Sequence, residues 1–234
     1  MLSTRTLVFA AICGACGAQA YGQAPAFPLQ PRWYLEASGG QSKTSGELVR
    51  NRESTIVNGT DIASDFDSKD AAWKLAAGMR VLPWLAIELN YADLGRAKLE
   101  TTLTAVSGGP AAIAIDRKVS GWGLDAVFAA PVAPRFSVYG RGGAYRSHLE
   151  TSAQLSGSIV FTNGDSSQTF RSSTLHETVG RVGVGVRWEA WRNGGIHAEY
   201  ERYFGIGKAF AVGGSGTTGE ADVDAWWIGV SQSF

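Results

Sequence analysis

The residues best able to do chemistry are eleven charged side chains that recur at alternate positions within short apolar runs, spaced by glycine, alanine and serine. They are Glu36, Lys74, Arg80, Glu88, Asp125, Arg141, Arg181, Arg187, Glu189, Glu199 and Glu201. Alternate residues of a strand point to one face of a sheet. Six acids and five bases on one enclosed face can pair through charge-assisted hydrogen bonds. The pattern predicts such a network without fixing which pairs form.

The histidines raise the possibility of catalysis. His148 and His176 flank a stretch rich in serine and threonine, and His197 lies elsewhere in the chain. The side chains near the first two in sequence are Ser147, Ser172, Ser173 and Glu177. A histidine, a serine and a carboxylate are the parts of a nucleophilic triad. No lipase or deacylase motif surrounds them, however, so we expect no catalytic residue and keep a lipid-modifying enzyme as an alternative.

Two further patterns suggest ligands and are better explained as polar loops. The acids Asp61, Asp65, Asp67 and Asp70 lack the spacing of a calcium loop. The run Gly213-Gly214-Ser215-Gly216 is not followed by the lysine and hydroxyl residue of a phosphate-binding loop. We therefore expect neither a cofactor nor a metal site.

The N-terminus has the pattern of a secretory signal peptide. Arg5 precedes the apolar run Leu7–Ala18, and Ala18-Gln19-Ala20 fits a cleavage site. We assign residues 1–20 to this leader, 21–31 to a proline-rich lead-in and 32–234 to one β-barrel. No later apolar run reaches the roughly 20 residues of a spanning helix. The formal net charge is +0, which gives no reason to expect a nucleic-acid partner.

Alternating polarity predicts the elements that position the charged residues. Apolar and polar residues alternate in eight runs, which indicate strands. These are Arg32–Gly40, 73–81, 85–92, 121–128, 136–141, 181–189, 196–204 and 222–234. Three connections are short, near Pro83, near Pro134 and at Asn193-Gly194, and the last has the usual chemistry of a hairpin turn. The other four, about 41–70, 95–116, 147–174 and 205–221, are expected to be long loops.

Aromatic residues on the apolar faces separate a membrane barrel from a soluble one. With strands running up and down in turn, they form two belts with aliphatic residues between them, typical of a lipid-facing band. The belt residues are Trp33, Trp73, Trp84, Tyr91, Trp122, Phe128, Phe136, Trp188, Phe204, Trp226 and Phe234. A soluble lipocalin-like barrel remains the alternative. We predict an all-β, eight-stranded antiparallel up-and-down transmembrane β-barrel with four long extracellular loops and three short periplasmic turns.

The runs Trp73–Gly95, Phe136–Arg146 and Val179–Phe204, with the closing strand that ends in Phe234, resemble the OmpA-like small outer-membrane β-barrels. The resemblance covers essentially all of Trp33–Phe234. It implies a monomeric barrel in the bacterial outer membrane, inserted by machinery that reads the C-terminal strand. It also implies outer-membrane lipid and lipopolysaccharide as surroundings.

Several functions are compatible with this fold. We expect a structural or surface-interaction role, in membrane integrity, adhesion or recognition through the long loops. The alternatives are a narrow passive channel for small solutes and the lipid-modifying enzyme considered above. The long charged side chains of the polar face argue against an open channel, because the lumen of an eight-stranded barrel is only wide enough for side chains to fill.

Overall fold

The structure is a computed structural model that describes residues 32–45, 59–105, 109–157, 170–207 and 220–234. These residues form nine strands. They are β1 (Arg32–Thr44), β2 (Gly59–Asp67), β3 (Lys69–Leu82), β4 (Leu85–Ala105), β5 (Gly109–Ala133), β6 (Phe136–Ser156), β7 (Phe170–Trp191), β8 (Gly194–Ile206) and β9 (Ala221–Ser233). In the described part of the chain no helix is long and apolar enough to cross a bilayer.

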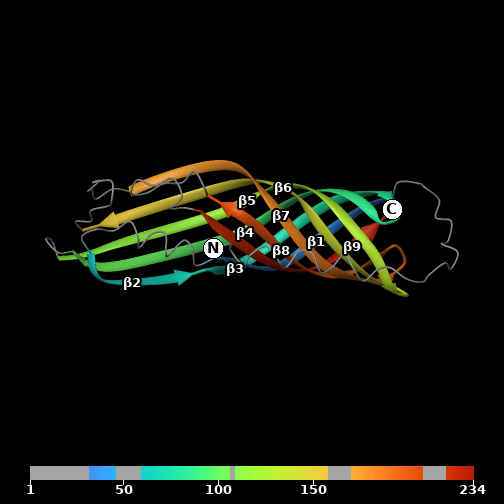
Figure 1. Ribbon diagram of the computed structural model, residues 1–234, viewed down its shortest axis with the longest axis horizontal. Coiled ribbons are helices and arrows are strands. Elements are labelled where there is room, and N and C mark those ends of the chain that lie inside the picture. The colour runs from blue at the N-terminus through green and yellow to red at the C-terminus, as the bar shows by residue number, and fades with distance from the viewer. Residues whose placement is uncertain (1–31, 46–58, 106–108, 158–169, 208–219) are drawn as a thin grey trace, which may run out of the picture.

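Eight of the strands close into a ring (Figure 1). Each strand pairs antiparallel with its neighbour in the order β4-β3-β1-β9-β8-β7-β6-β5, and β5 pairs back with β4. The first and last strands meet along the seam where Tyr34 lies opposite Ser233 and Thr44 opposite Val223. β2 prolongs β3 and pairs only with the far end of β4. The predicted eight-stranded antiparallel barrel is therefore confirmed.

The three short connections are where the sequence places them. β3 and β4 are joined at Pro83-Trp84, β5 and β6 at Pro134-Arg135, and β7 and β8 at Arg192-Asn193. Arg135 and Asn193 have positive φ angles of 71° and 63°, the left-handed conformation that tight turns require.

Strand alternation turns the apolar residues outward around the ring. Ten of the eleven belt residues are exposed, and Tyr91 is half-buried. At the short-turn end Trp84 stacks on Phe128, with ring centroids 6.0 Å apart. At the other end Tyr91 contacts Trp122, with ring centroids 5.1 Å apart. The outer face between the two ends is aliphatic and suits a hydrocarbon layer about 25 Å tall.

The predicted long loops are wrong in their extent, because strands continue into all four. β1 runs on to Thr44, and β2 together with the first residues of β3 lies within the segment expected to be a loop up to Asp70. β4 and β5 leave only a few residues between Ala105 and Gly109, where a loop from 95 to 116 was expected. β6 extends to Ser156, β7 begins at Phe170, and β8 continues to Ile206.

Beyond the outer belt the polarity of the two faces is reversed, and this explains the error. We call the parts of β2, β4, β5, β6 and β7 at residues 59–67, 96–105, 109–120, 146–156 and 170–178 the outer extension. Over the described residues, β1, β8 and β9 do not pair with these segments. Figure 1 shows the long strands running past the short ones at one end.

Apolar side chains of the outer extension point inward. They are Ile62, Phe66, Leu99, Leu103, Ala111, Ile113, Ile115, Ala153, Leu155 and Leu175. Polar side chains such as Lys98, Glu100 and Glu150 are exposed on the outside. Because the outside must now face water, the alternation is inverted relative to the belts, and the sequence looks polar and irregular there.

A bulge in β4 marks the change. The register shifts between Asp93 and Arg96, and Gly95 has a φ angle of +74°. Its backbone N–H donates to Oδ1 of Asp93 at 2.9 Å. Leu94 and Ala97 are both buried, so the bulge moves the inward phase of β4 by one residue.

Candidate functional site

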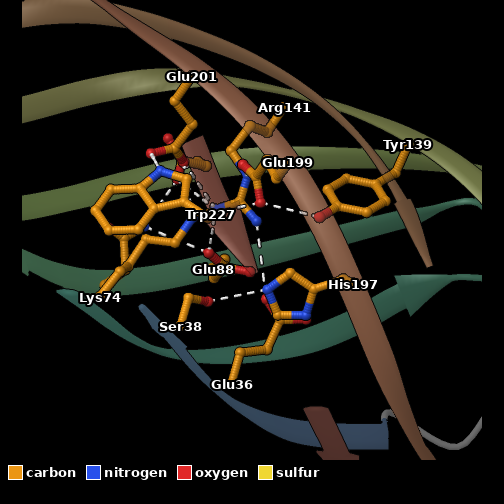
Figure 2. A network of polar contacts seen from close by, with 12 residues as sticks. Glu36, Ser38, Lys74, Glu88, Tyr139, Arg141, His197, Glu199, Glu201 and Trp227 are labelled. Carbon is orange, nitrogen blue, oxygen red and sulfur yellow. Dashed lines mark hydrogen bonds and ion pairs between the residues drawn. The ribbon is translucent and has the colours of Figure 1, made fainter. Parts of the chain in front are cut away.

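The most distinctive cluster in the molecule is a set of nine buried charged residues inside the barrel, which we call the interior network. Its members are Glu36, Lys74, Glu88, Asp125, Arg141, Arg181, Arg187, Glu199 and Glu201. Five are acids and four are bases, and they come from seven of the eight strands of the ring. Figure 2 shows Glu36, Lys74, Glu88, Arg141, Glu199 and Glu201 of this network directed toward one another across the lumen.

Arg141 on β6 is the hub of the interior network. Its guanidinium lies within 4.0 Å of all five carboxylates. The nitrogen-to-oxygen distances are 2.5 Å to Glu88 and Glu199, 3.5 Å to Glu201, 3.6 Å to Asp125 and 3.8 Å to Glu36. The Arg141 side chain has no exposed surface, so this charge is compensated by protein groups.

Lys74 on β3 supports the same carboxylates from the opposite wall. Its Nζ donates to Glu201 at 2.9 Å and to Glu199 at 3.3 Å. Oε2 of Glu201 also accepts from the Trp227 indole at 2.8 Å and from the Tyr203 hydroxyl at 2.6 Å. A carboxylate with this many donors needs no bulk water to be stabilised.

Arg181 and Arg187 on β7 complete the pairing. Arg181 binds Asp125 through two nitrogens, with Nε 2.9 Å from Oδ1. Asn90 donates to the same carboxylate at 2.8 Å. Arg187 binds Glu36 near the short-turn end. The two-nitrogen contact fixes the Arg181 side chain more firmly than a single ion pair would.

Glycines on the inward face make room for two tyrosines that join the network. A Cβ on Gly78 would overlap the Tyr34 ring, and one on Gly185 would lie 2.5 Å from the Tyr139 ring. With that space free, the Tyr34 hydroxyl donates to Glu88 at 3.0 Å and the Tyr139 hydroxyl to Glu199 at 2.9 Å. The glycines that space the charges in the sequence are therefore needed for packing.

Apolar layers close the lumen on both sides of the interior network. Tyr34, Ala86, Val127 and Tyr139 pack together toward the short-turn end. Toward the outer extension the cluster is larger, and it includes Leu94, Tyr145, Leu149, Tyr203 and Trp227. Charges between two apolar layers can lock the strands in register and block flow, but no opening for a substrate is seen among these residues.

Two of the eleven predicted lumen charges are not among the nine buried ones. Arg80 is half-buried, and Glu189 is exposed at the short-turn end. Glu189, predicted to belong to the lumen network, is therefore not one of its enclosed charges. The β7–β8 register shifts between Trp188 and Trp191, so alternation does not carry through to Glu189.

Sequence reasoning missed the neutral members of the lumen. The indole of Trp227 and the hydroxyls of Tyr34 and Tyr139 donate to network carboxylates, and Asn90 bridges Asp125 and Glu88. The sequence did indicate that these residues point inward, because they occupy the same alternate strand positions as the charges. Tyrosine and tryptophan on that phase were not expected to act as donors.

The histidines are not arranged as the enzyme alternative requires. His148 and His176 lie on the outer face, while Ser147 is buried on the inner face and donates to the Glu177 carbonyl. His197 is buried inside the barrel, with Nε2 2.9 Å from Oγ of Ser38. Its Nδ1 has no hydrogen-bond partner, so this Ser–His pair lacks the third group that orients a catalytic histidine.

The other expected features lie partly outside the described residues. The side chains of Asp65 and Asp67 are exposed on β2, and Asp70 accepts the Arg96 backbone N–H at 2.7 Å. Over the described ranges no group of three or more His, Cys, Asp or Glu side chains is placed to hold a metal ion. The Asp61 side chain, the Gly213–Gly216 run, the leader and the proline-rich lead-in are not described.

The match to a known protein family agrees with this architecture. Residues 28–232 match the family described as the OmpA-like transmembrane domain. No curated protein matches the sequence. Among solved structures, Neisserial surface protein A is similar at 16% identity, 86% coverage of this chain, 97% of that chain and a TM-score of 0.47. Ail, the attachment invasion locus protein of Yersinia pestis, is similar at 15% identity, with 88% of this chain and 99% of that chain covered and a TM-score of 0.45.

OprG from Pseudomonas aeruginosa is similar at 11% identity, with 87% of this chain and 96% of that chain covered and a TM-score of 0.46. The family match spans nearly all of the described barrel. With the closed ring and the outward apolar band, it shows that this chain belongs to the OmpA-like transmembrane-domain family of β-barrels of the bacterial outer membrane.

Proposed function

We propose that the protein is a closed barrel that serves as a structural and surface-interaction element of the outer membrane. The observation that carries this proposal is the combination of a filled interior with an ordered outer extension. The interior network gives the barrel a fixed shape, and the outer extension presents polar strands beyond the membrane.

The filled interior supports a scaffold role. The nine charges of the interior network are buried and cross-paired, and the apolar layers on both sides add further barriers. In an eight-stranded barrel the side chains alone can fill the lumen. Charge pairs that join different strands hold the strands in one register and make the barrel rigid. A membrane scaffold needs both properties.

The outer extension supports contact with partners. Its outer face carries charges of both signs, among them Lys98, Glu100, Lys118 and Glu150. Just beyond the belt, Lys43, Arg96 and Lys118 would lie at the height of lipid head groups. We therefore infer lipopolysaccharide as the immediate partner of this zone, and adhesion or recognition as the role of the distal part. Folding as a monomer by the outer-membrane insertion machinery, through β9 and Phe234, belongs to the same proposal.

The test is a matched pair of surface variants in a strain that lacks the native protein. One variant replaces Lys98, Glu100, Asp116 and Glu150 of the outer extension with serine. The control replaces Glu189 and Arg192, exposed at the short-turn rim, in the same way. We expect the first variant, and not the control, to reduce adhesion, serum survival or phage sensitivity at equal amounts of folded protein. Unchanged behaviour in all three assays would refute the surface role.

A narrow channel is the second candidate. Some buried polar atoms of the lumen have no protein partner, including Oδ1 of Asn90 and Nδ1 of His197, and water could satisfy them. If the network blocks flow, truncating Arg141, Glu88 and Glu199 together to serine should raise single-channel conductance in planar bilayers. A native conductance already equal to that of the triple variant would favour the channel over the closed scaffold.

A further inference from the structure

Two histidines lie side by side on the outside of the barrel, on neighbouring strands. His148 of β6 is directly opposite His176 of β7. The ring centroids are 4.7 Å apart, and the two Nδ1 atoms are 3.4 Å apart. The pair lies in the outer extension, two residues beyond Arg146, which pairs with Trp122 of the outer belt. Solvent reaches it, since the His148 side chain is 36% exposed.

The separation of the two nitrogens suits chelation of a metal ion. Zinc binds imidazole nitrogen at about 2.0–2.1 Å in tetrahedral geometry, which places two ligand nitrogens about 3.3–3.4 Å apart. The Nδ1 atoms already have this spacing. We propose that His148 and His176 form a bidentate site for a divalent transition-metal ion of the imidazole-binding class, such as Zn²⁺ or Cu²⁺, on the extracellular side of the barrel.

A carboxylate on the other side of one ring supports this assignment. Nε2 of His148 lies 3.2 Å from Oε1 of Glu150, on the same face of β6. A carboxylate that accepts one ring N–H fixes the tautomer and leaves the other nitrogen free to bind a metal. Glu150 therefore positions the His148 ring with Nδ1 directed toward His176. In many metal sites the ligating histidine donates its second ring N–H to a carboxylate. His148 and Glu150 have this arrangement.

The charged neighbours of the pair are engaged elsewhere. On β6, Arg146 donates to the Thr178 hydroxyl at 3.1 Å. On β5, Lys118 is 3.8 Å from Asp93, and the residue opposite His148 is the neutral Ser120.

The chain supplies two ligand atoms, with water completing the coordination, so we expect micromolar rather than structural-zinc affinity. The site goes beyond the sequence analysis, which predicts no metal, and it does not depend on the proposed function.

The experiment is metal titration of tag-free, full-length protein folded in detergent micelles. Isothermal titration with Zn²⁺ and electron paramagnetic resonance with Cu²⁺ should give one ion per barrel, with two nitrogen ligands in the copper spectrum. His148→Ala and His176→Ala should each weaken binding at least tenfold, because both rings are needed for chelation. Glu150→Gln should weaken it severalfold. Ser120→Ala, opposite His148, is the matched control and should bind like the native protein.

A second readout uses stability. The two rings are 28 residues apart in sequence and come together only when β6 and β7 pair, so metal binds the folded state preferentially. Zn²⁺ should therefore raise the urea midpoint of the native protein and of Ser120→Ala, but not that of the histidine variants. Because both histidines are on the outside, their variants should fold, and heat-modifiable gel migration checks this. Equal metal affinity in the native protein and a His148→Ala/His176→Ala variant would overturn the proposal.

Discussion

Arg141→Ala should be the most damaging single truncation in the interior network. Arg141 lies within 4.0 Å of five carboxylates, two of them at 2.5 Å. Its loss leaves those five acids with only three cations, all in a closed lumen. Breaking one buried pair costs about 3–5 kcal/mol. We expect a loss near the top of this range, reduced to about 3 kcal/mol if water enters the vacated space.

The matched control is Arg202→Ala. Arg202 also pairs with two carboxylates, at 2.8 Å to Asp222 and 3.8 Å to Asp224, but on the outer face with 43% of its side chain exposed. Exposed pairs contribute at most about 1 kcal/mol. With a urea dependence of roughly 2 kcal/mol per molar, the midpoint should fall by about 2.5 M for Arg141→Ala, or by about 1.5 M if water enters the vacated space. The control should lower it by less than about 0.5 M.

The assay is urea unfolding in micelles, followed by tryptophan fluorescence and by heat-modifiable migration on gels. Adding Glu88→Gln to Arg141→Ala should recover part of the loss, because it removes one stranded carboxylate. Equal midpoints for the two arginine variants, or no recovery in the double variant, would refute the view that the interior charges form one coupled network.

Three further predictions use the same assay. Val184→Arg should destabilise the barrel by about 2–4 kcal/mol, since Val184 is 60% exposed on the lipid face. Thr174→Arg, farther along the same face of β7 and opposite Glu150, should cost under about 1 kcal/mol, and similar losses in the two variants would show that the membrane band is assigned to the wrong residues. Gly78→Ala should lower the urea midpoint, because the added Cβ would crowd the Tyr34 ring. Gly39→Ala should be tolerated, since a Cβ there meets nothing within 4 Å. A larger loss of stability for Gly39→Ala than for Gly78→Ala would contradict the packing argument. Arg187→Met should destabilise more than Arg187→Met combined with Glu36→Gln, because the double variant leaves no buried unpaired carboxylate, and additive losses would count against that pairing.

The membrane part of the fold was predictable because one period governs it. From Val182 to Trp188 every second residue is apolar, and the structure exposes these residues outward. The same alternation places Arg181 and Arg187 inside. The partner of each charge was not predictable, because pairing depends on strand stagger: Arg141 reaches Glu88 and Glu199, which lie on β4 and β8.

The outer extension could not be recognised by the rule that worked for the membrane part. Leu99, Leu103, Ile113 and Ile115 do alternate, but their apolar phase points inward and their polar neighbours face water. A search for strands whose apolar residues face lipid therefore takes such a segment for a loop. The bulge at Gly95 adds a second obstacle, since it shifts the phase of β4 midway. The His148–His176 contact was hidden for the same reason, because both residues were assigned to the edges of a loop.

The unequal strand lengths determine how the protein meets its surroundings. β5 has 25 residues and β9 has 13. At about 3.3 Å per residue and a tilt near 40°, β5 would stand roughly 60 Å tall against a hydrocarbon layer of about 25 Å. Much of that height is hydrogen-bonded sheet. A molecule that binds its distal face would therefore meet a surface that is already ordered, and little conformational entropy would be lost on contact. Recognition there should be closer to the docking of rigid bodies than to capture by flexible arms.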